Sequence, residues 1–154
     1  MENIKKIEKM LITAIFEVLE KMFFVFTELL RGKSSGIYHM KTDISFNGPV
    51  NGSMQILFSR GVAETMAINI LDLDQVEVTD QIVADCLKES INMICGNFVR
   101  KLDSKRVFHL SIPTVDMISE DFQRDHQTKA HEIRIILAAE DGDIEVSMTA
   151  PDIL

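Results

Sequence analysis

A polar stripe near the middle of the chain carries the residues best suited to chemistry. It consists of Asp85, Glu89, Asn92 and Gly96, which follow one another at intervals of four, three and four residues. At about 100° per residue, these four positions fall on one narrow face of an α-helix. The stripe therefore places two carboxylates, an amide and a glycine where a partner could reach all of them at once.

Glu89 and Asn92 are the pair in this stripe best placed to act together. Residues three apart on a helix start about 5–6 Å from each other and project in nearly the same direction. An amide has two donors and an acceptor and does not titrate near neutrality, so Asn92 is suited to orienting a water molecule. The carboxylate of Glu89 can accept from a lysine or arginine of a partner. Gly96 costs up to ~1 kcal/mol of helix propensity relative to alanine, which makes sense where something approaches the helix closely.

The same residues also allow a purely structural interpretation. Exposed helix faces are normally polar, so Asp85, Glu89 and Asn92 could simply be solvated. Gly96 could equally be a packing contact against another helix. However, Asp85 and Glu89 form a like-charged i, i+4 pair, which destabilises a helix by a few tenths of a kcal/mol. That small penalty, partly offset by Lys88, favours a functional role.

A long amphipathic helix is needed to present the stripe. Its opposite face is apolar and consists of Val83, Leu87, Ile91, Ile94, Phe98 and Leu102. Thr79 or Asp80 can cap its amino end, and we expect it to run to about Leu102.

The remaining pattern alternates between helices and strands. Periodicity predicts a first helix from about Asn3 to Leu30, with Phe26 and Leu29 on its buried face and the glycine-containing segment 31–36 as its end. The other expected elements are a hairpin of Ile37–Phe46 and Gly52–Phe58, a short helix Gly61–Leu71, a strand Arg106–Pro113, a loop over 117–129, and a hairpin of His131–Ala139 and Asp143–Thr149. Tight turns imply antiparallel pairing. The predicted class is α+β: an antiparallel sheet covered by two long helices and one short helix, in a single domain over residues 1–154.

Composition narrows the classes of function. The 154 residues carry 24 acidic and 16 basic side chains, a net charge of −8, and the basic residues are scattered. This argues against binding to a nucleic-acid backbone, which requires clustered lysine and arginine. Residues 10–30 are apolar, but four charges interrupt them, so we expect no membrane insertion and a cytoplasmic protein. These charges are Glu17, Glu20, Lys21 and Glu28.

The cysteines and histidines suggest neither a disulfide nor a metal site. Cys86 and Cys95 are expected roughly 13 Å apart along one helix, which is too far for a mutual disulfide. We interpret them as buried thiols of a protein in a reducing compartment. No histidine lies near them in sequence to form a catalytic pair. The four histidines show no zinc-binding spacing. They are His39, His109, His126 and His131.

A weak internal repeat links the two long helices. Aligning Glu17 with Glu89 places Thr13 opposite Asp85 and Glu20 opposite Asn92, and strands follow both helices. A duplication would explain this alignment, and so would two unrelated amphipathic helices.

The stripe also resembles a known signature. The pattern D-x3-E-x2-N from Asp85 to Asn92, followed by MICGN at 93–97, resembles the signature helix of the CheC/CheX/FliY family of chemotaxis phosphatases. The segment VNGSMQILF at 50–58, followed by a short helix, is similar to the family's strand before that helix. The resemblance covers nearly the whole chain, and its single motif makes it most similar to CheX.

This resemblance implies a function and a role for each residue of the stripe. It implies dephosphorylation of an aspartyl phosphate on a CheY-like response regulator, which also supplies Mg²⁺, while this chain binds no cofactor. Asn92 would orient the attacking water and Glu89 would pair with a lysine of the regulator. Asp85 and Gly96 would be partner contacts. The resemblance further implies a homodimer.

Where two-site members of the family carry Glu and Asn in the first helix, this chain has Glu17 and Glu20. A carboxylate lacks the donors of an amide and would repel a phosphoryl group, so we predict that the first helix is structural. Besides the phosphatase, two alternatives remain. One is a non-catalytic module that binds receiver domains. The other is a dimerisation protein of the same fold whose stripe is only solvated.

Overall fold

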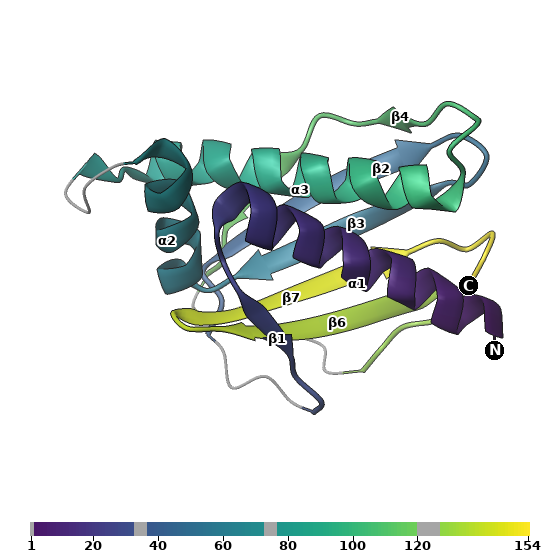
Figure 1. Ribbon diagram of the computed structural model, residues 1–154, viewed down its shortest axis with the longest axis horizontal. Coiled ribbons are helices and arrows are strands. Elements are labelled where there is room, and N and C mark those ends of the chain that lie inside the picture. Colours follow the sequence, from purple (N-terminus) through teal and green to yellow (C-terminus); the bar gives the residue numbers. More distant parts are fainter. Residues whose placement is uncertain (1, 33–36, 73–76, 120–126) are drawn as a thin grey trace.

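The computed structural model describes residues 2–32, 37–72, 77–119 and 127–154. In these residues the chain forms three helices and seven strands (Figure 1). The helices are α1 (Glu2–Phe23), α2 (Arg60–Leu71) and α3 (Asp80–Leu102). The strands are β1 (Thr27–Leu29), β2 (Met40–Asn47), β3 (Gly52–Phe58), β4 (His109–Leu110), β5 (Thr114–Met117), β6 (Glu132–Ala139) and β7 (Gly142–Thr149).

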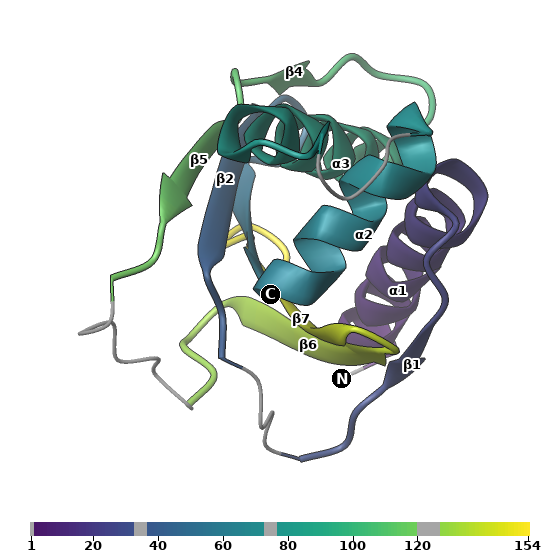
Figure 2. The same ribbon diagram turned by 90° about the vertical axis from the view of Figure 1, so that its left-hand side faces the viewer.

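One antiparallel sheet contains all seven strands. The strand order is β1-β6-β7-β3-β2-β4, and β5 pairs with β2 at a different point along that strand. Both predicted hairpins are present, as β2–β3 and β6–β7. All three helices lie on the same side of the sheet (Figures 1 and 2). The predicted fold class, an antiparallel sheet covered by two long helices and one short one, is confirmed.

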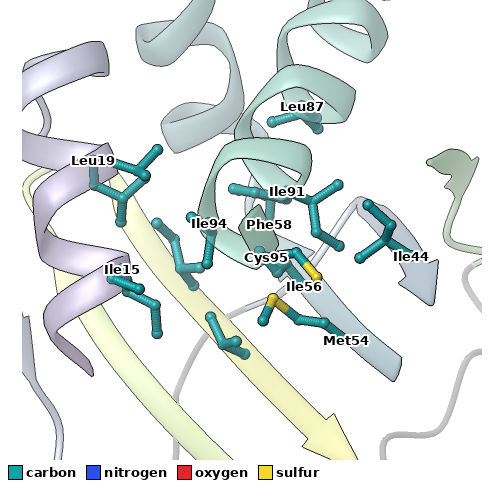
Figure 3. Packing of buried hydrophobic residues seen from close by; sticks show 14 of the residues in the cluster. Ile15, Leu19, Ile44, Met54, Ile56, Phe58, Leu87, Ile91, Ile94 and Cys95 are labelled. Carbon is teal, nitrogen blue, oxygen red and sulfur yellow. The ribbon is translucent and has the colours of Figure 1, made fainter. Parts of the chain in front are cut away.

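The core lies between the sheet and the helices. Strand β2 shows how the sequence specifies it, because every second residue is buried and the residues between are half-buried. The buried ones are Met40, Thr42, Ile44 and Phe46. Thr42 is polar, and its hydroxyl donates to the backbone oxygen of Ile56 at 3.2 Å. Figure 3 shows side chains of α1, α3 and the central strands converging on this layer, among them Ile15, Leu19, Met54, Ile91 and Ile94.

The predicted end of the first helix is wrong. Helix α1 ends at Phe23, Phe24 takes a left-handed φ of 55°, and β1 follows as an edge strand paired with β6. Phe26 and Leu29, expected on a buried helical face, are 72% and 45% exposed. An unbroken apolar run fits a helix or a strand equally well, and here the aromatic and β-branched residues and the free edge of β6 favour a strand.

The shortened helix has its own stop signal. The side-chain amide of Asn69, on α2, donates to the carbonyl oxygen of Phe23 at 3.0 Å, which satisfies an acceptor left over at the helix end. Gly36, part of the predicted end, lies outside the described residues. Among the described residues, none of the helices has the apolar length that a bilayer crossing requires.

The strand predictions after α3 are also partly wrong. Of the predicted strand Arg106–Pro113 only His109–Leu110 is formed, and Met117, expected in a loop, is the last residue of β5. The first hairpin also starts later than predicted, at Met40. Strand β5 has no clear alternation because it is a short edge strand, held by its pairing with β2. Residues 120–126 of the expected loop lie outside the described residues.

The sheet repeats its topology about its centre, where β3 pairs with β7. In the first half, α1 is followed by β1, which joins the other half's strand β6, and then by the hairpin β2–β3. In the second half, α3 is followed by β4 and β5, which join β2, and then by the hairpin β6–β7. A long helix, an edge segment and a hairpin thus occur twice in this order, whereas the short helix α2 occurs once, and a duplication stays a prediction.

Candidate functional site on helix α3

Local interactions define where α3 begins and ends. The hydroxyl oxygen of Thr79, the N-cap, accepts from the backbone N–H of Ile82 at 3.2 Å. Asp80 in the first turn, and Arg100 and Lys101 in the last, have the charges that the helix dipole favours at those ends. The stripe thus lies within a well-capped helix of 23 residues.

The back of α3 anchors the helix to the core, as predicted. Five of the six residues predicted for this face are at most 4% exposed, and the sixth, Leu102, is half-buried. They are Val83, Leu87, Ile91, Ile94 and Phe98. Burial of such side chains contributes roughly 1.5–3 kcal/mol each, so the rotation of α3 about its axis is strongly determined. That rotation turns the opposite stripe to the solvent.

The front of α3 brings the predicted site residues together on one exposed face. Asp85, Glu89 and Asn92 are all exposed. The carboxylate of Asp85 accepts from the side-chain amide of Gln81 at 2.9 Å. Within the described part of the chain, the side chains of Glu89 and Asn92 have no hydrogen bond or ion pair, so their polar atoms are available to a partner.

Gly96 continues this face one turn beyond Asn92. Apart from the adjoining backbone of α3 itself, a Cβ atom placed on Gly96 would meet no atom within 4 Å, and the φ of Gly96 is not in the left-handed region. The alternative that Gly96 packs against another helix of this chain is therefore wrong for the residues described. Neither close packing nor backbone conformation requires a glycine at this position.

The corresponding face of α1 is occupied by contacts within the protein. Glu17 accepts from the ammonium group of Lys101, on α3, at 3.1 Å, and both side chains are about one-third exposed, at 34% and 30%. Glu20 is half-buried. The carboxylate aligned with Glu89 thus joins the two long helices, which supports the prediction that α1 is structural.

The sequence profile described as "Chemotaxis phosphatase CheX" matches residues 42–138, which include the whole stripe. The chain belongs to the CheX family. The matched region begins after α1 and ends within β6, so the first helix lies outside it.

Several solved structures share the fold of this CheX-family chain. A CheX of Desulfovibrio desulfuricans is 22% identical, with 94% of this chain and 99% of that one covered and a TM-score of 0.71. A CheX of Vibrio vulnificus is 22% identical, with coverages of 94% and 95% and a TM-score of 0.74. The CheX in a CheX-CheY-BeF3-Mg+2 complex of Borrelia burgdorferi is 24% identical, with coverages of 92% and 96% and a TM-score of 0.72. No curated protein matches the chain.

The two thiols of this CheX-family chain are unreactive at neutral pH. Burial, together with the negative charge of Glu89, raises the pKa of Cys86 to about 12, and burial raises that of Cys95 to about 12. Both thiols are therefore protonated and poorly nucleophilic at neutral pH. Both are free and lie on the buried side of α3.

The histidines are placed apart from one another. The ring Nδ1 of His39 accepts from the backbone N–H of Arg60 at 3.3 Å, His109 is exposed on β4, and His131 contacts the backbone oxygen of Leu154. His126 lies outside the described residues. Among the residues that the structure describes, no three His, Cys, Asp or Glu side chains are grouped so as to hold a metal ion.

A groove beside Gly96 was not predicted. It has a volume of about 320 Å³ and lies between the carboxyl-terminal half of α3 and the segment leading to β4. Its lining includes Gly96, Arg100, Asp103, Arg106 and Phe108. The i, i+3 and i, i+4 spacing of the stripe continues from Gly96 to Arg100 and Asp103, so the sequence contained a signal for two of these residues.

Proposed function

We propose that the protein is a phosphatase that hydrolyses the aspartyl phosphate of a CheY-like response regulator. The observation that carries this proposal is the exposed, uncommitted pair of Glu89 and Asn92 on the face of a firmly anchored helix. Membership of the CheX family supports it, as does the solved complex of a similarly folded CheX with CheY.

The proposed mechanism assigns Asn92 to the attacking water. Its amide would enter the regulator's site, accept a hydrogen bond from the water and hold it in line with the phosphorus–oxygen bond to be broken. Water attacks phosphorus, the bond to the aspartyl oxygen breaks, and the products are the free aspartate and inorganic phosphate. Catalysis of this kind is mainly positioning and electrostatics, so one well-placed amide can supply much of the rate.

The remaining residues of the stripe hold the regulator in place. Glu89, one turn before Asn92, would pair with a lysine of the regulator, and Mg²⁺ would come with the regulator. Asp85, held by Gln81, would contact the partner at the amino-terminal end of the stripe. Gly96 would let the partner come close to the helix backbone.

The decisive experiment measures how fast a purified, phosphorylated response regulator loses its phosphoryl group. We expect wild-type protein to accelerate the decay, and Asn92→Ala to remove most of that acceleration while binding to the regulator persists. Asn3→Ala, the same change at an exposed position on α1, is the matched control and should behave like wild type.

Two other outcomes would contradict different parts of this proposal. Binding by wild-type protein without any change in phosphate lifetime would favour a non-catalytic receiver-binding module. Equal acceleration by wild type and Asn92→Ala would rule out the water-positioning role. The homodimer implied by the resemblance stays a prediction, which sedimentation of the purified protein would test.

A further inference from the structure

The positive charges near the groove beside Gly96 are not equivalent. The ammonium group of Lys101 is paired with Glu17 on α1. The guanidinium group of Arg106 donates to the carboxylate of Asp103 at 2.7 Å, a contact that lowers the pKa of Asp103. Arg100 is exposed and has no ion pair or side-chain hydrogen bond within the described residues. Of the two arginines that line the groove, Arg100 is the one without an ion pair in the described part of the chain.

The front of α3 therefore changes sign along its length. Asp85 and Glu89 make its amino-terminal end negative, and Arg100 makes its carboxyl-terminal end positive. Arg100 lies eight residues beyond Asn92, which is about 12 Å at the rise of an α-helix. An interface of ordinary size, near 800 Å² per partner, spans both ends of such a surface.

The groove itself is firmly built. Phe108 forms part of its wall and packs edge-on against the buried ring of Phe46, with ring centroids 6.3 Å apart. Leu110, also in the wall, pairs in register with Phe46 on β2, and β4 runs alongside α3 (Figure 2). Gly96 belongs both to this wall and to the stripe, so the groove is continuous with the proposed catalytic face.

We propose that this groove receives an acidic segment of the phosphorylated receiver domain and that Arg100 pairs with a carboxylate there. The inference rests on the proposed function and adds a second point of attachment to it. A partner that places a cation opposite Glu89 and a carboxylate opposite Arg100 fits the face in one direction only. Arg100 is therefore a docking residue that selects among receiver domains, and Asn92 performs the chemistry. Because the whole chain carries a net charge of −8, a local positive charge is also needed to attract an acidic surface.

The test compares Arg100→Glu, Arg100→Lys and wild type on a receiver domain that is purified and phosphorylated. We expect Arg100→Glu to lower kcat/KM roughly tenfold at low ionic strength while kcat is unchanged, because a rim charge acts on encounter and not on the chemical step. Raising the salt to about 0.5 M should shrink the difference, since screening shortens the reach of exposed charges. Arg100→Lys should stay close to wild type.

Lys129→Glu is the matched control. It makes the same change of charge at an exposed position just before β6, and β7, β3 and β2 separate β6 from β4 in the sheet. The strand spacing puts it roughly 19 Å from the groove wall. The proposal would be overturned if Lys129→Glu lowered kcat/KM as much as Arg100→Glu does. It would also be overturned if Arg100→Glu changed neither kcat/KM nor its dependence on salt.

Binding and self-association are measured on the same variants. Titration calorimetry with the same receiver domain tests the role of Arg100 even if no hydrolysis is seen. If Asn92→Ala lost activity while Arg100→Glu bound and reacted like wild type, the phosphatase proposal would stand and the proposal for Arg100 would fail. If Arg100→Glu altered sedimentation of the protein and not receiver binding, the groove would be a contact between copies of the chain, contrary to the proposal.

Discussion

Helices α1 and α3 can be compared position by position, using the 72 residues that separate Glu17 from Glu89. Six positions of α1 that are at most 1% exposed fall, under this shift, on six buried positions of α3. The pairs are Leu11 with Val83, Ala14 with Cys86, Ile15 with Leu87, Val18 with Ser90, Leu19 with Ile91, and Phe23 with Cys95. The two helices thus bury corresponding faces in the core.

The two fronts differ in what their polar groups contact. In α1, Glu17 is tied to Lys101, whereas in α3 the corresponding Glu89 has no partner in the described part of the chain. The position of Gly96 in α3 corresponds to Phe24, where α1 has already ended. Helix α3 continues to Leu102 and so supplies Arg100 to the groove. Both helices bury one face against the core, and α3 keeps an exposed polar face whose Glu89 is not tied to the other helix.

The first prediction tests the equivalence of the two backs. Ile15 and Leu87 are corresponding residues and both are 0% exposed. We expect Ile15→Ala and Leu87→Ala each to lower the free energy of unfolding by about 2–5 kcal/mol, because each leaves a cavity in the core. Urea denaturation of the two variants and wild type gives both values. A loss under about 1 kcal/mol for one of them would show that the helices are not structurally equivalent.

The second prediction concerns the fronts. Asn92→Asp keeps the shape of the side chain but replaces the amide's donors with a negative charge, which is the chemistry that α1 carries at Glu20. We expect the rate of regulator dephosphorylation to fall by about 10²–10³-fold, the usual effect of removing a group that stabilises the reacting centre. Single-turnover decay of the phosphorylated regulator measures it.

Glu20→Gln on α1 is the control for that change. It should leave the rate within about twofold of wild type, because we assign α1 no part in the reaction. A large loss in Glu20→Gln would mean that both fronts take part and would remove the distinction between the helices.

The third prediction concerns Cys86 of α3, which corresponds to Ala14 of α1. Burial raises the pKa of Cys86 in the folded protein from its ordinary value of 9.0, which applies to the unfolded chain, to about 12. Below that lower value both states are protonated and stability does not depend on this group. Between the two values the unfolded state alone loses its proton, so the free energy of unfolding falls by about 1.4 kcal/mol per pH unit for each such thiol.

Replacing Cys86 with Ala, the residue of α1, should remove that contribution. Between pH 9 and pH 10 we expect the stability of Cys86→Ala to fall less than that of wild type, with a difference of about 1.4 kcal/mol at pH 10. Denaturant titrations at these pH values measure the difference. Parallel pH profiles for the two proteins would mean that Cys86 is as accessible to solvent in the folded state as in the unfolded state.

Much of α3 and of the sheet is specified by the local sequence. The back of α3, the placement of Asp85, Glu89 and Asn92 on its exposed face, and both hairpins follow from local periodicity and turn residues, and all were predicted. The end of α1 was not, because Phe24 and its apolar neighbours fit a helix or a strand equally well, and the choice depends on the free edge of β6 and the capping amide of Asn69.

The groove was missed for a related reason. Arg100 continues the spacing of the stripe, but the opposite wall comes from Phe108 and Leu110, which are brought next to α3 by pairing with β2. Which basic side chains have an ion pair likewise depends on contacts such as that between Lys101 and Glu17, which are 84 residues apart in the chain. Such long-range contacts have no local signature in the sequence.

The last and smallest prediction concerns Gly96. Because an added Cβ meets nothing within 4 Å, Gly96→Ala should raise the free energy of unfolding by up to ~1 kcal/mol through helix propensity. The same methyl group would stand between the helix backbone and a docked regulator, so kcat/KM for dephosphorylation should fall. Thermal denaturation and initial rates measure the two effects on one variant.

Gly61 on α2 supplies the contrast. A Cβ there would clash with the backbone oxygen of Asp141, so Gly61→Ala should destabilise the protein. The fold thus requires Gly61 and not Gly96. A glycine that lowers stability without serving the fold is explained if the partner needs the space. A Gly96→Ala variant that gained stability and kept full activity would remove that explanation and, with it, the reason to place the regulator against this turn of α3.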